Sequence, residues 1–135
     1  MKEFDKWNEV KKATDAKSFK IGIKSREIYW VKIGVNIGNE EYGKGNEFVR
    51  PVVIIRQLTK DLFIGVPTTT AEKENSDYFQ SIHYTNKNGK DINSFAMILQ
   101  QRVFSKKRLL YKIGMIKKEE FKIIVEKLKR LIDPT

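Results

Sequence analysis

The 135-residue chain contains no cysteine and only one histidine, His83. The lack of cysteine excludes disulfides, thiolate zinc sites and cysteine nucleophiles, and it is typical of proteins from a reducing compartment. A single histidine excludes histidine-rich metal sites and catalysis by paired histidines. No run of residues is apolar and long enough to span a membrane, and residues 1–20 lack the apolar core of a signal peptide. We therefore expect a soluble, cytoplasmic protein that does not bind membranes.

Acidic residues are scarce near the C-terminus, so the net charge of +10 is unevenly distributed. Residues 103–130 contain ten lysines or arginines and three glutamates, whereas residues 28–102 contain nine basic and eight acidic residues. This asymmetry indicates a polyanionic partner, either a nucleic acid or an acidic protein segment. Abundant surface lysine that only keeps the protein soluble explains the charge equally well.

Helical periodicity appears at both ends of the chain. Residues 3–17 place Phe4, Trp7 and Val10 along one side, which predicts a short helix that packs on the main body. Near the C-terminus, apolar side chains recur at the spacing of an amphipathic helix, and Pro134 ends it. These apolar positions are Phe121, Ile124, Val125, Leu128, Leu131 and Ile132.

Between these helices the sequence predicts a meandering sheet of five or six strands. Runs of β-branched and aromatic residues mark the strands, at residues 26–33, 51–57, 62–67, 78–84, 94–101 and 111–116. In the first strand both alternating faces are apolar, so we expect both to be covered. Ser105 is placed to cap a short helix over residues 106–110. Antiparallel strands without alternating helices predict a mainly β, α+β fold, arranged as a barrel or a roll.

Several short segments occur in an order that resembles the PemK/MazF family of toxins. They are Arg26-Glu27-Ile28-Tyr29-Trp30-Val31, Gly38-Asn39-Glu40, Arg50-Pro51-Val52-Val53-Ile54-Ile55, Val66-Pro67-Thr68-Thr69-Thr70, Gln100-Gln101-Arg102, Ser105-Lys106-Lys107-Arg108-Leu109 and Lys112-Ile113-Gly114-Met115-Ile116. The resemblance covers about residues 25–132. It implies an SH3-like or CcdB-like barrel over residues 25–135, with residues 1–24 as an N-terminal helical extension, and a homodimer.

The same resemblance implies a function. Members of the family are mostly metal-independent endoribonucleases that cut single-stranded RNA, including mRNA, at short preferred sequences, and each is neutralised by a cognate antitoxin. An RNA 2′-hydroxyl attacks the adjacent phosphate and leaves a 2′,3′-cyclic phosphate and a free 5′-hydroxyl. This reaction needs a base, a cation for the developing charge and a proton donor, but no cofactor.

Three residues match catalytic positions of the family. Arg50 matches its essential arginine, whose forked donors can hold two phosphate oxygens. Thr69 matches a hydroxyl residue at the phosphate, although a run of threonines also commonly ends a strand. Glu40 matches a loop glutamate and is the predicted base, or the residue that positions it. A solvated loop acid beside Glu41 is the alternative for Glu40.

Further residues are predicted to contact RNA, namely Thr70, Gln100, Arg102, Asn39 and Lys44. Arg102 has an alternative role as the partner of an acid at the edge of the core. Tyr29 and Trp30 have side chains that can stack on bases, but we expect at least one of them in the core.

The sequence also departs from the family pattern. Certain relatives place an arginine and an aspartate where this chain has Met97 and Leu99, and a loop histidine where it has Asn39. His83 matches no catalytic position and is predicted to be a structural or a surface histidine. A relative that binds RNA without cutting it therefore stays open as an alternative. A gyrase poison resembling CcdB is less favoured, because the chain ends in residues 131–135 (LIDPT) and lacks a terminal Trp-Gly-x-Ile.

Overall fold

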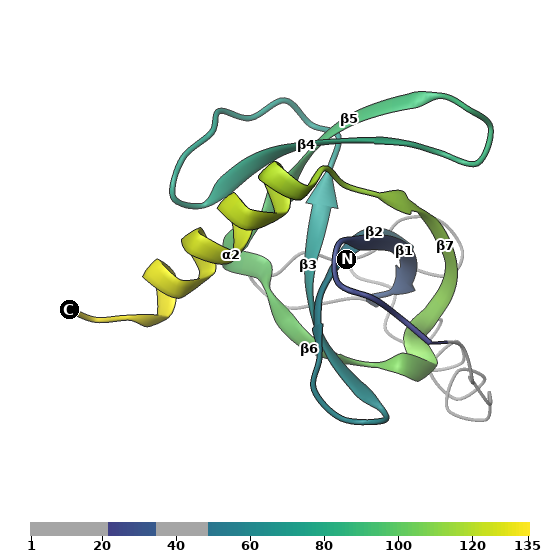
Figure 1. The fold of residues 1–135 in the computed structure, drawn as a ribbon, viewed down its shortest axis with the longest axis horizontal. Helices are drawn as coiled ribbons and strands as arrows, with labels where there is room; N and C mark the ends of the chain where they lie inside the picture. The colour runs from purple at the N-terminus through teal and green to yellow at the C-terminus, as the bar shows by residue number, and fades with distance from the viewer. Residues whose placement is uncertain (1–21, 35–48) are drawn as a thin grey trace, which may run out of the picture.

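The structure is a computed structural model that describes residues 22–34 and 49–135 (Figure 1). The predicted helix over residues 3–17 and the loop that carries Asn39, Glu40 and Lys44 lie outside the described residues. The described elements are β1 (Glu27–Lys32), β2 (Val49–Gln57), β3 (Leu62–Thr69), β4 (Phe79–Thr85), β5 (Asp91–Met97), the 3₁₀ helix η1 (Ile98–Gln100), β6 (Arg102–Ser105), the 3₁₀ helix η2 (Lys106–Arg108), β7 (Leu109–Met115) and α2 (Lys118–Ile132).

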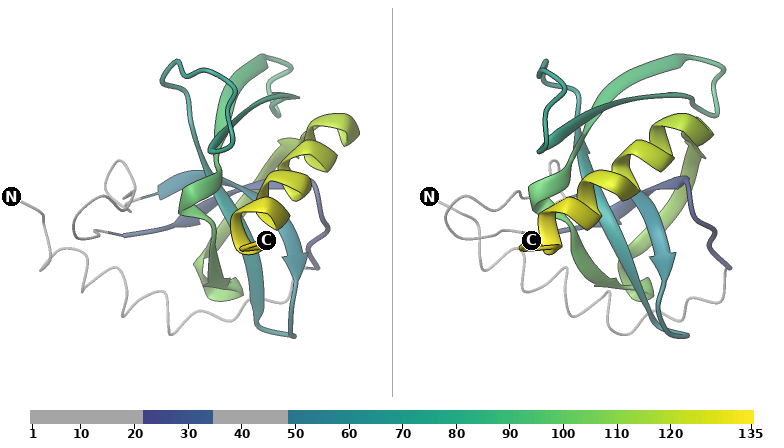
Figure 2. Two further views of the ribbon diagram at one scale, coloured as in Figure 1. Left: turned by 90° about the vertical axis from the view of Figure 1, so that its left-hand side faces the viewer. Right: turned by 60° about the vertical axis from the view of Figure 1, so that its left-hand side comes forward.

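The strands form one antiparallel sheet of seven strands in the order β4-β5-β3-β2-β1-β7, and β6 also pairs with β3. Strand β3 is shared between two neighbours on one side. Its first half pairs with β6 over Leu62–Gly65, and its end pairs with β5 only at Thr68 and Thr69. The sheet is strongly curved, and the β4–β5 hairpin projects from it (Figure 2). The described part is therefore mainly β with one C-terminal α-helix, as the sequence predicts.

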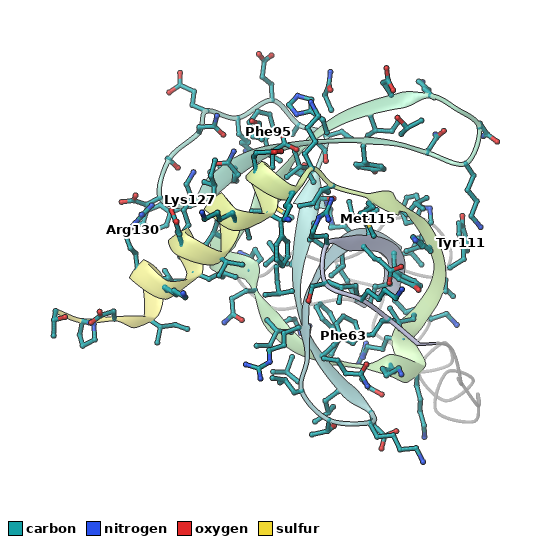
Figure 3. All side chains as sticks on the ribbon, viewed as in Figure 1. Phe63, Phe95, Tyr111, Met115, Lys127 and Arg130 are labelled. Atoms are coloured by element: carbon teal, nitrogen blue, oxygen red, sulfur yellow. The ribbon has the colours of Figure 1, made fainter. Side chains whose placement is uncertain are left out.

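Both faces of the sheet carry a core, because neighbouring residues of a strand point to opposite sides. On β2, Val52 and Ile54 pack with Phe63 and Phe104 inside the curve of the sheet, and Figure 3 labels Phe63 there. Val53, between them in the sequence, belongs to the core on the other face. The two rings of Phe63 and Phe104 are stacked with their centroids 5.5 Å apart. On β1, Ile28 belongs to the core of one face and Tyr29 and Val31 to the core of the other, so the prediction that both faces of the first strand are covered is confirmed.

Two element predictions were wrong at their boundaries. The strand predicted over residues 94–101 ends at Met97, and residues 98–100 form η1, in which the Gln101 amide donates to the Ile98 carbonyl (3.2 Å). The Ile98 amide still donates to the Tyr78 carbonyl beside β4 (2.8 Å). The predicted helix over residues 106–110 is the shorter η2, although Ser105 caps it as expected by accepting from the Lys107 amide (3.2 Å). Strand β6 was not predicted.

Helix α2 lies against β4 and η1. Ile124 and Leu128 belong to the core that also contains Val53 of β2 and Ile82 of β4. Lys127 is also buried, and its ammonium donates to Gln80 Oε1 (2.7 Å) and to the Phe79 carbonyl (3.1 Å). Burial lowers the pKa of Lys127 and neighbouring Arg130 lowers it further, while Asp77 opposes the shift. The helix is thus fixed to β4 by apolar and polar contacts together. Within the described residues, no helix is long and apolar enough to cross a membrane.

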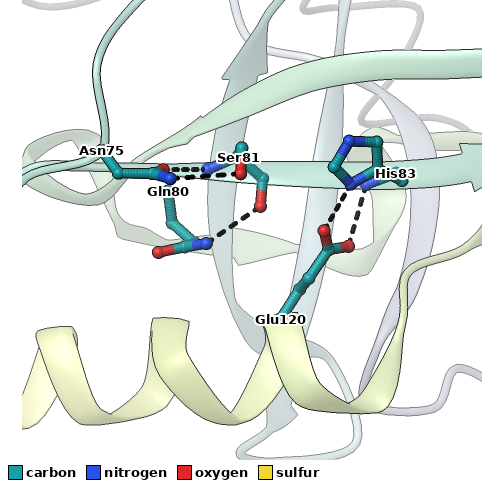
Figure 4. A network of polar contacts seen from close by, with 5 residues as sticks. All are labelled: Asn75, Gln80, Ser81, His83 and Glu120. Carbon is teal, nitrogen blue, oxygen red and sulfur yellow. Dashed lines mark hydrogen bonds and ion pairs between the residues drawn. The ribbon is translucent and has the colours of Figure 1, made fainter.

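The N-terminal end of α2 is attached to the middle of β4 by one carboxylate (Figure 4). Glu120 accepts from the backbone amide of His83 (2.9 Å) and contacts Nδ1 of the same residue. Its side chain is 13% exposed, whereas the His83 side chain is 43% exposed. His83 is therefore half on the surface and serves as an attachment point for the helix, in agreement with its predicted structural role.

Replacing Glu120 with alanine is expected to destabilise the fold by about 1–2 kcal/mol more than replacing Glu119, because it leaves the His83 amide without its partner. Both substitutions remove one negative charge from the first turn of α2, so their effects on the helix dipole cancel in the comparison. Urea unfolding of the two variants measures the difference. Equal losses of stability would mean that the contact with His83 contributes nothing.

Candidate functional site

Arg50 lies at the beginning of β2, in the strand end closest to the β4–β5 hairpin. It is 6% exposed, although it carries a charge, and its Nη1 donates to the carbonyl oxygen of Thr68 (3.0 Å). Val52 opposes Pro67 in the pairing of β2 with β3, so the antiparallel register continued by two residues brings Arg50 opposite Thr69. The fold therefore places the guanidinium against the end of β3.

The three threonines at the end of β3 have different roles. Thr68 is 2% exposed and donates its hydroxyl to the Pro51 carbonyl (3.1 Å), which ties β3 to β2. The Thr69 hydroxyl accepts from the amide of Ala71 (3.2 Å) and can still donate its own proton. Thr70 is exposed. Thr69 is thus held in position beside Arg50 with a hydrogen-bond donor to offer.

Arg50 and Thr69 line two hollows in the surface. The first has a volume of about 300 Å³ and is walled mainly by apolar and aromatic groups. Its lining residues are Trp30, Val49, Arg50, Pro51, Thr68, Thr69, Thr70, Tyr84 and Ser94. Burial raises the pKa of the Tyr84 phenol above its usual value.

The second hollow has a volume of about 360 Å³ and shares Arg50 and Thr69 with the first. Its other lining residues are Ala71, Lys73, Tyr78, Phe79, Met97, Leu99 and Gln100. Lys73 adds a second cation here, and its ammonium lies 5.3 Å from the centroid of the Phe79 ring. An arginine and a threonine at the junction of two hollows, both with aromatic walls, can hold an anionic group whose neighbours enter the hollows on either side.

The structure brings some of the sequence-predicted residues together and separates others. Thr70 lines the first hollow and Gln100 the second. Arg102 lies on β6, with its guanidinium carbon 4.8 Å from the centroid of the Phe104 ring, and it is not among the lining residues of either hollow. Tyr29 is buried in the core, whereas Trp30 lines the first hollow. Asn39, Glu40 and Lys44 lie outside the part of the chain that the structure describes.

Sequence reasoning missed several residues that line the hollows, among them Tyr84, Ser94, Lys73 and Tyr78. Tyr84 lies on β4 and Ser94 on β5, the two paired strands of the hairpin, and Lys73 and Tyr78 belong to the segment between β3 and β4. For Tyr78 and Lys73, the sequence signal was an aromatic residue five positions after a lysine, which is a weak indication of a binding surface. Nothing in the sequence distinguishes Ser94 from an ordinary strand serine.

The fold and the two hollows define a small, basic, mainly β protein that presents a buried arginine and a threonine in a groove. The sequence matches, over residues 24–132, the family of PemK-like, MazF-like toxins of type II toxin–antitoxin systems, and the chain belongs to this family. Toxins of this family are generally RNA-cleaving enzymes that have RNA as substrate and an antitoxin as partner. Comparison with curated proteins gives no match for this chain.

Proposed function

We propose that this chain is a metal-independent endoribonuclease that cuts single-stranded RNA at a short preferred sequence. The observation that carries the proposal is the position of Arg50 and Thr69, which both line each of the two hollows, with the Arg50 guanidinium held by the carbonyl of Thr68. A phosphate at this point has a nucleotide on either side, and each hollow has room and aromatic walls for one of them.

In the proposed reaction the RNA 2′-oxygen attacks the adjacent phosphorus, and the bond from phosphorus to the 5′-oxygen breaks. The products are a 2′,3′-cyclic phosphate and a 5′-hydroxyl. The 2′-hydroxyl gives its proton to a base, for which Glu40 is the proposed group, and the departing 5′-oxygen takes up a proton. Arg50 stabilises the negative charge that grows on the phosphorane oxygens, and the Thr69 hydroxyl donates to one of them.

The remaining predictions belong to this proposal. Gln100 and Thr70 contact the RNA from the two hollows, and the basic C-terminal region attracts either RNA or the acidic tail of an antitoxin. Asn39, Lys44 and Arg102 are also proposed to bind RNA. We also propose that the curved sheet is an SH3-like or CcdB-like barrel, that residues 1–24 form a helical extension, and that the toxin acts as a cytoplasmic homodimer.

A second candidate function is RNA binding without cleavage. It is favoured by Met97 and Leu99, which line the second hollow where certain relatives have an arginine and an aspartate. Met97 carries a thioether and Leu99 an alkyl group, so neither side chain can supply a proton or a charge. If the protein does cut RNA, catalysis depends on Arg50, Thr69 and Glu40 without an arginine and aspartate at positions 97 and 99.

Incubation of the purified, antitoxin-free protein with a long single-stranded RNA in EDTA distinguishes the two functions. We expect cuts at a recurring short sequence. Each cut should leave a 2′,3′-cyclic phosphate on the upstream fragment and a 5′-hydroxyl on the downstream fragment. Sequencing of ligated 5′-hydroxyl fragments maps them. An RNA that stays intact in the presence of folded protein would rule out the endoribonuclease and leave the binding function.

A further inference from the structure

Ser94 is a buried hydroxyl whose position the proposed cleavage chemistry does not explain. It is 3% exposed, it lines the first hollow, and among the residues that the structure describes its Oγ has no hydrogen-bond partner. A hydroxyl buried without a partner destabilises a fold, so such groups in native proteins call for an explanation. Because Ser94 faces a hollow, a ligand in that hollow can supply the missing partner.

The walls around Ser94 suit a flat, aromatic ligand. Trp30 and Pro51 belong to neighbouring strands and are paired with each other, and Tyr84 comes from the β4–β5 hairpin. Tyr84 is held by close packing on Gly114 of β7, where a Cβ would lie 2.9 Å from Tyr84 Cδ2 and 3.0 Å from the Thr85 carbonyl oxygen. The aromatic wall is therefore in a fixed place before a ligand arrives.

We propose that the first hollow binds one nucleobase of single-stranded RNA, next to the phosphate at Arg50, and that Ser94 is a specificity-determining residue that hydrogen-bonds the edge of this base. The inference rests on the proposed function for RNA as the ligand. A hydroxyl both donates and accepts, so it can pair with a polar base edge while the rings cover the apolar faces. An apolar side chain of a protein partner would fill the hollow but leave Ser94 unpaired.

The test is a binding cycle that combines a protein substitution with removal of single bases from the RNA. The probe is a fluorescent, fully 2′-O-methylated single-stranded RNA, which cannot be cut. It carries the mapped cut sequence or, if nothing is cut, the sequence that the wild-type protein enriches from a random pool. Wild type, Ser94→Ala and Ser81→Ala are titrated with the intact probe and with probes lacking one base each. Ser81 is the matched control, because it is a half-buried serine on the same hairpin outside the lining of the first hollow.

We expect one base removal next to the cut position to weaken wild-type binding about 10-fold, which is the scale of stacking on an aromatic ring. Ser94→Ala is expected to weaken binding of the intact probe about 5-fold and to show a smaller loss when that same base is removed. Ser81→Ala should behave as wild type. Ser94→Ala should also unfold at the same or a higher urea concentration, since it removes an unpaired buried hydroxyl.

The inference is overturned if Ser94→Ala binds every probe as wild type does, or if no base removal weakens wild-type binding, in which case the hollow is left for a protein side chain. Absence of RNA binding by the wild type overturns it too. Ser94 and a base are coupled if removal of that base weakens binding less in Ser94→Ala than in wild type. Such coupling in a protein that cuts no RNA would support the base site and reject the endoribonuclease. Cleavage without coupling would support the enzyme and reject the base site.

Discussion

Replacing Arg50 with alanine is expected to lower the rate of RNA cleavage by a factor of about 100 to 1,000, the usual loss when a preorganised donor to a developing oxyanion is removed. Arg50 is 6% exposed and its guanidinium is directed by the hydrogen bond to the Thr68 carbonyl, so in the proposed reaction it would meet the developing charge in surroundings that contain little water. Single-turnover cleavage at saturating enzyme measures the loss without interference from RNA binding.

Arg50→Lys separates charge from geometry. Lysine keeps the positive charge but lacks the planar fork, so we expect its cleavage rate to fall between those of wild type and Arg50→Ala. Arg56→Ala is the matched control, since Arg56 is an exposed arginine on the same strand. Because Arg50 is buried, the unfolding midpoint of each variant must be measured beside its activity. A folded Arg50→Ala protein that cuts RNA as fast as wild type would show that Arg50 is not part of the catalytic site.

Much of the fold could be predicted from local patterns in the sequence. Six apolar residues at helical spacing marked α2, and β-branched runs marked most of the strands. Strand β6 was missed because it has four residues, of which only Phe104 is buried. The end of β5 was also missed, because the chain turns into η1 where Ile98 is buried in the core with Ile124 and Leu128 of α2, which are far away in the sequence. Local patterns carry no information on such tertiary contacts.

The site was less predictable than the fold. Gln100 and Arg102 are two residues apart and would share one face of a continuous strand. The chain instead forms η1 up to Gln100 and starts β6 at Arg102, so one side chain enters the second hollow and the other lies over Phe104. The pairing of Arg50 with Thr69 likewise follows from the register of β2 with β3, which the sequence indicates only through its resemblance to the toxin family.

The first hollow depends on how firmly the β4–β5 hairpin is held. The hairpin pairs with the rest of the sheet only at Thr68 and Thr69, yet it contributes Tyr84 and Ser94 to the hollow. The hairpin is also held by the packing of Tyr84 on Gly114 of β7 and by α2, which packs on β4 through Ile124, Leu128 and Lys127. A helix more than twenty residues away along the chain from Ser94 is thus part of the support for the site. This arrangement predicts that loosening α2 affects both stability and binding.

Ile124→Ala is expected to reduce the free energy of unfolding by about 2–5 kcal/mol, because it removes a fully buried side chain from the interface between α2 and β4. The adjacent Ile123 is 39% exposed, so the identical substitution there is expected to change stability by less than about 0.5 kcal/mol. Both variants replace an isoleucine of α2 with alanine, so the change in helix-forming tendency is the same. The two positions differ in how deeply the isoleucine side chain is buried. Urea unfolding with equal slopes for all three proteins measures the effect as a shift of the midpoint.

The same pair of variants tests the support of the site by α2. Under conditions in which both remain folded, Ile124→Ala is expected to bind the uncleavable RNA more weakly than Ile123→Ala, since β4 then holds Tyr84 less firmly beside Ser94. A large loss of stability with unchanged RNA affinity would show instead that the hairpin keeps its position through Thr68, Thr69 and the packing of Tyr84 on Gly114. Equal stability of the two variants would contradict the docking of α2 on β4.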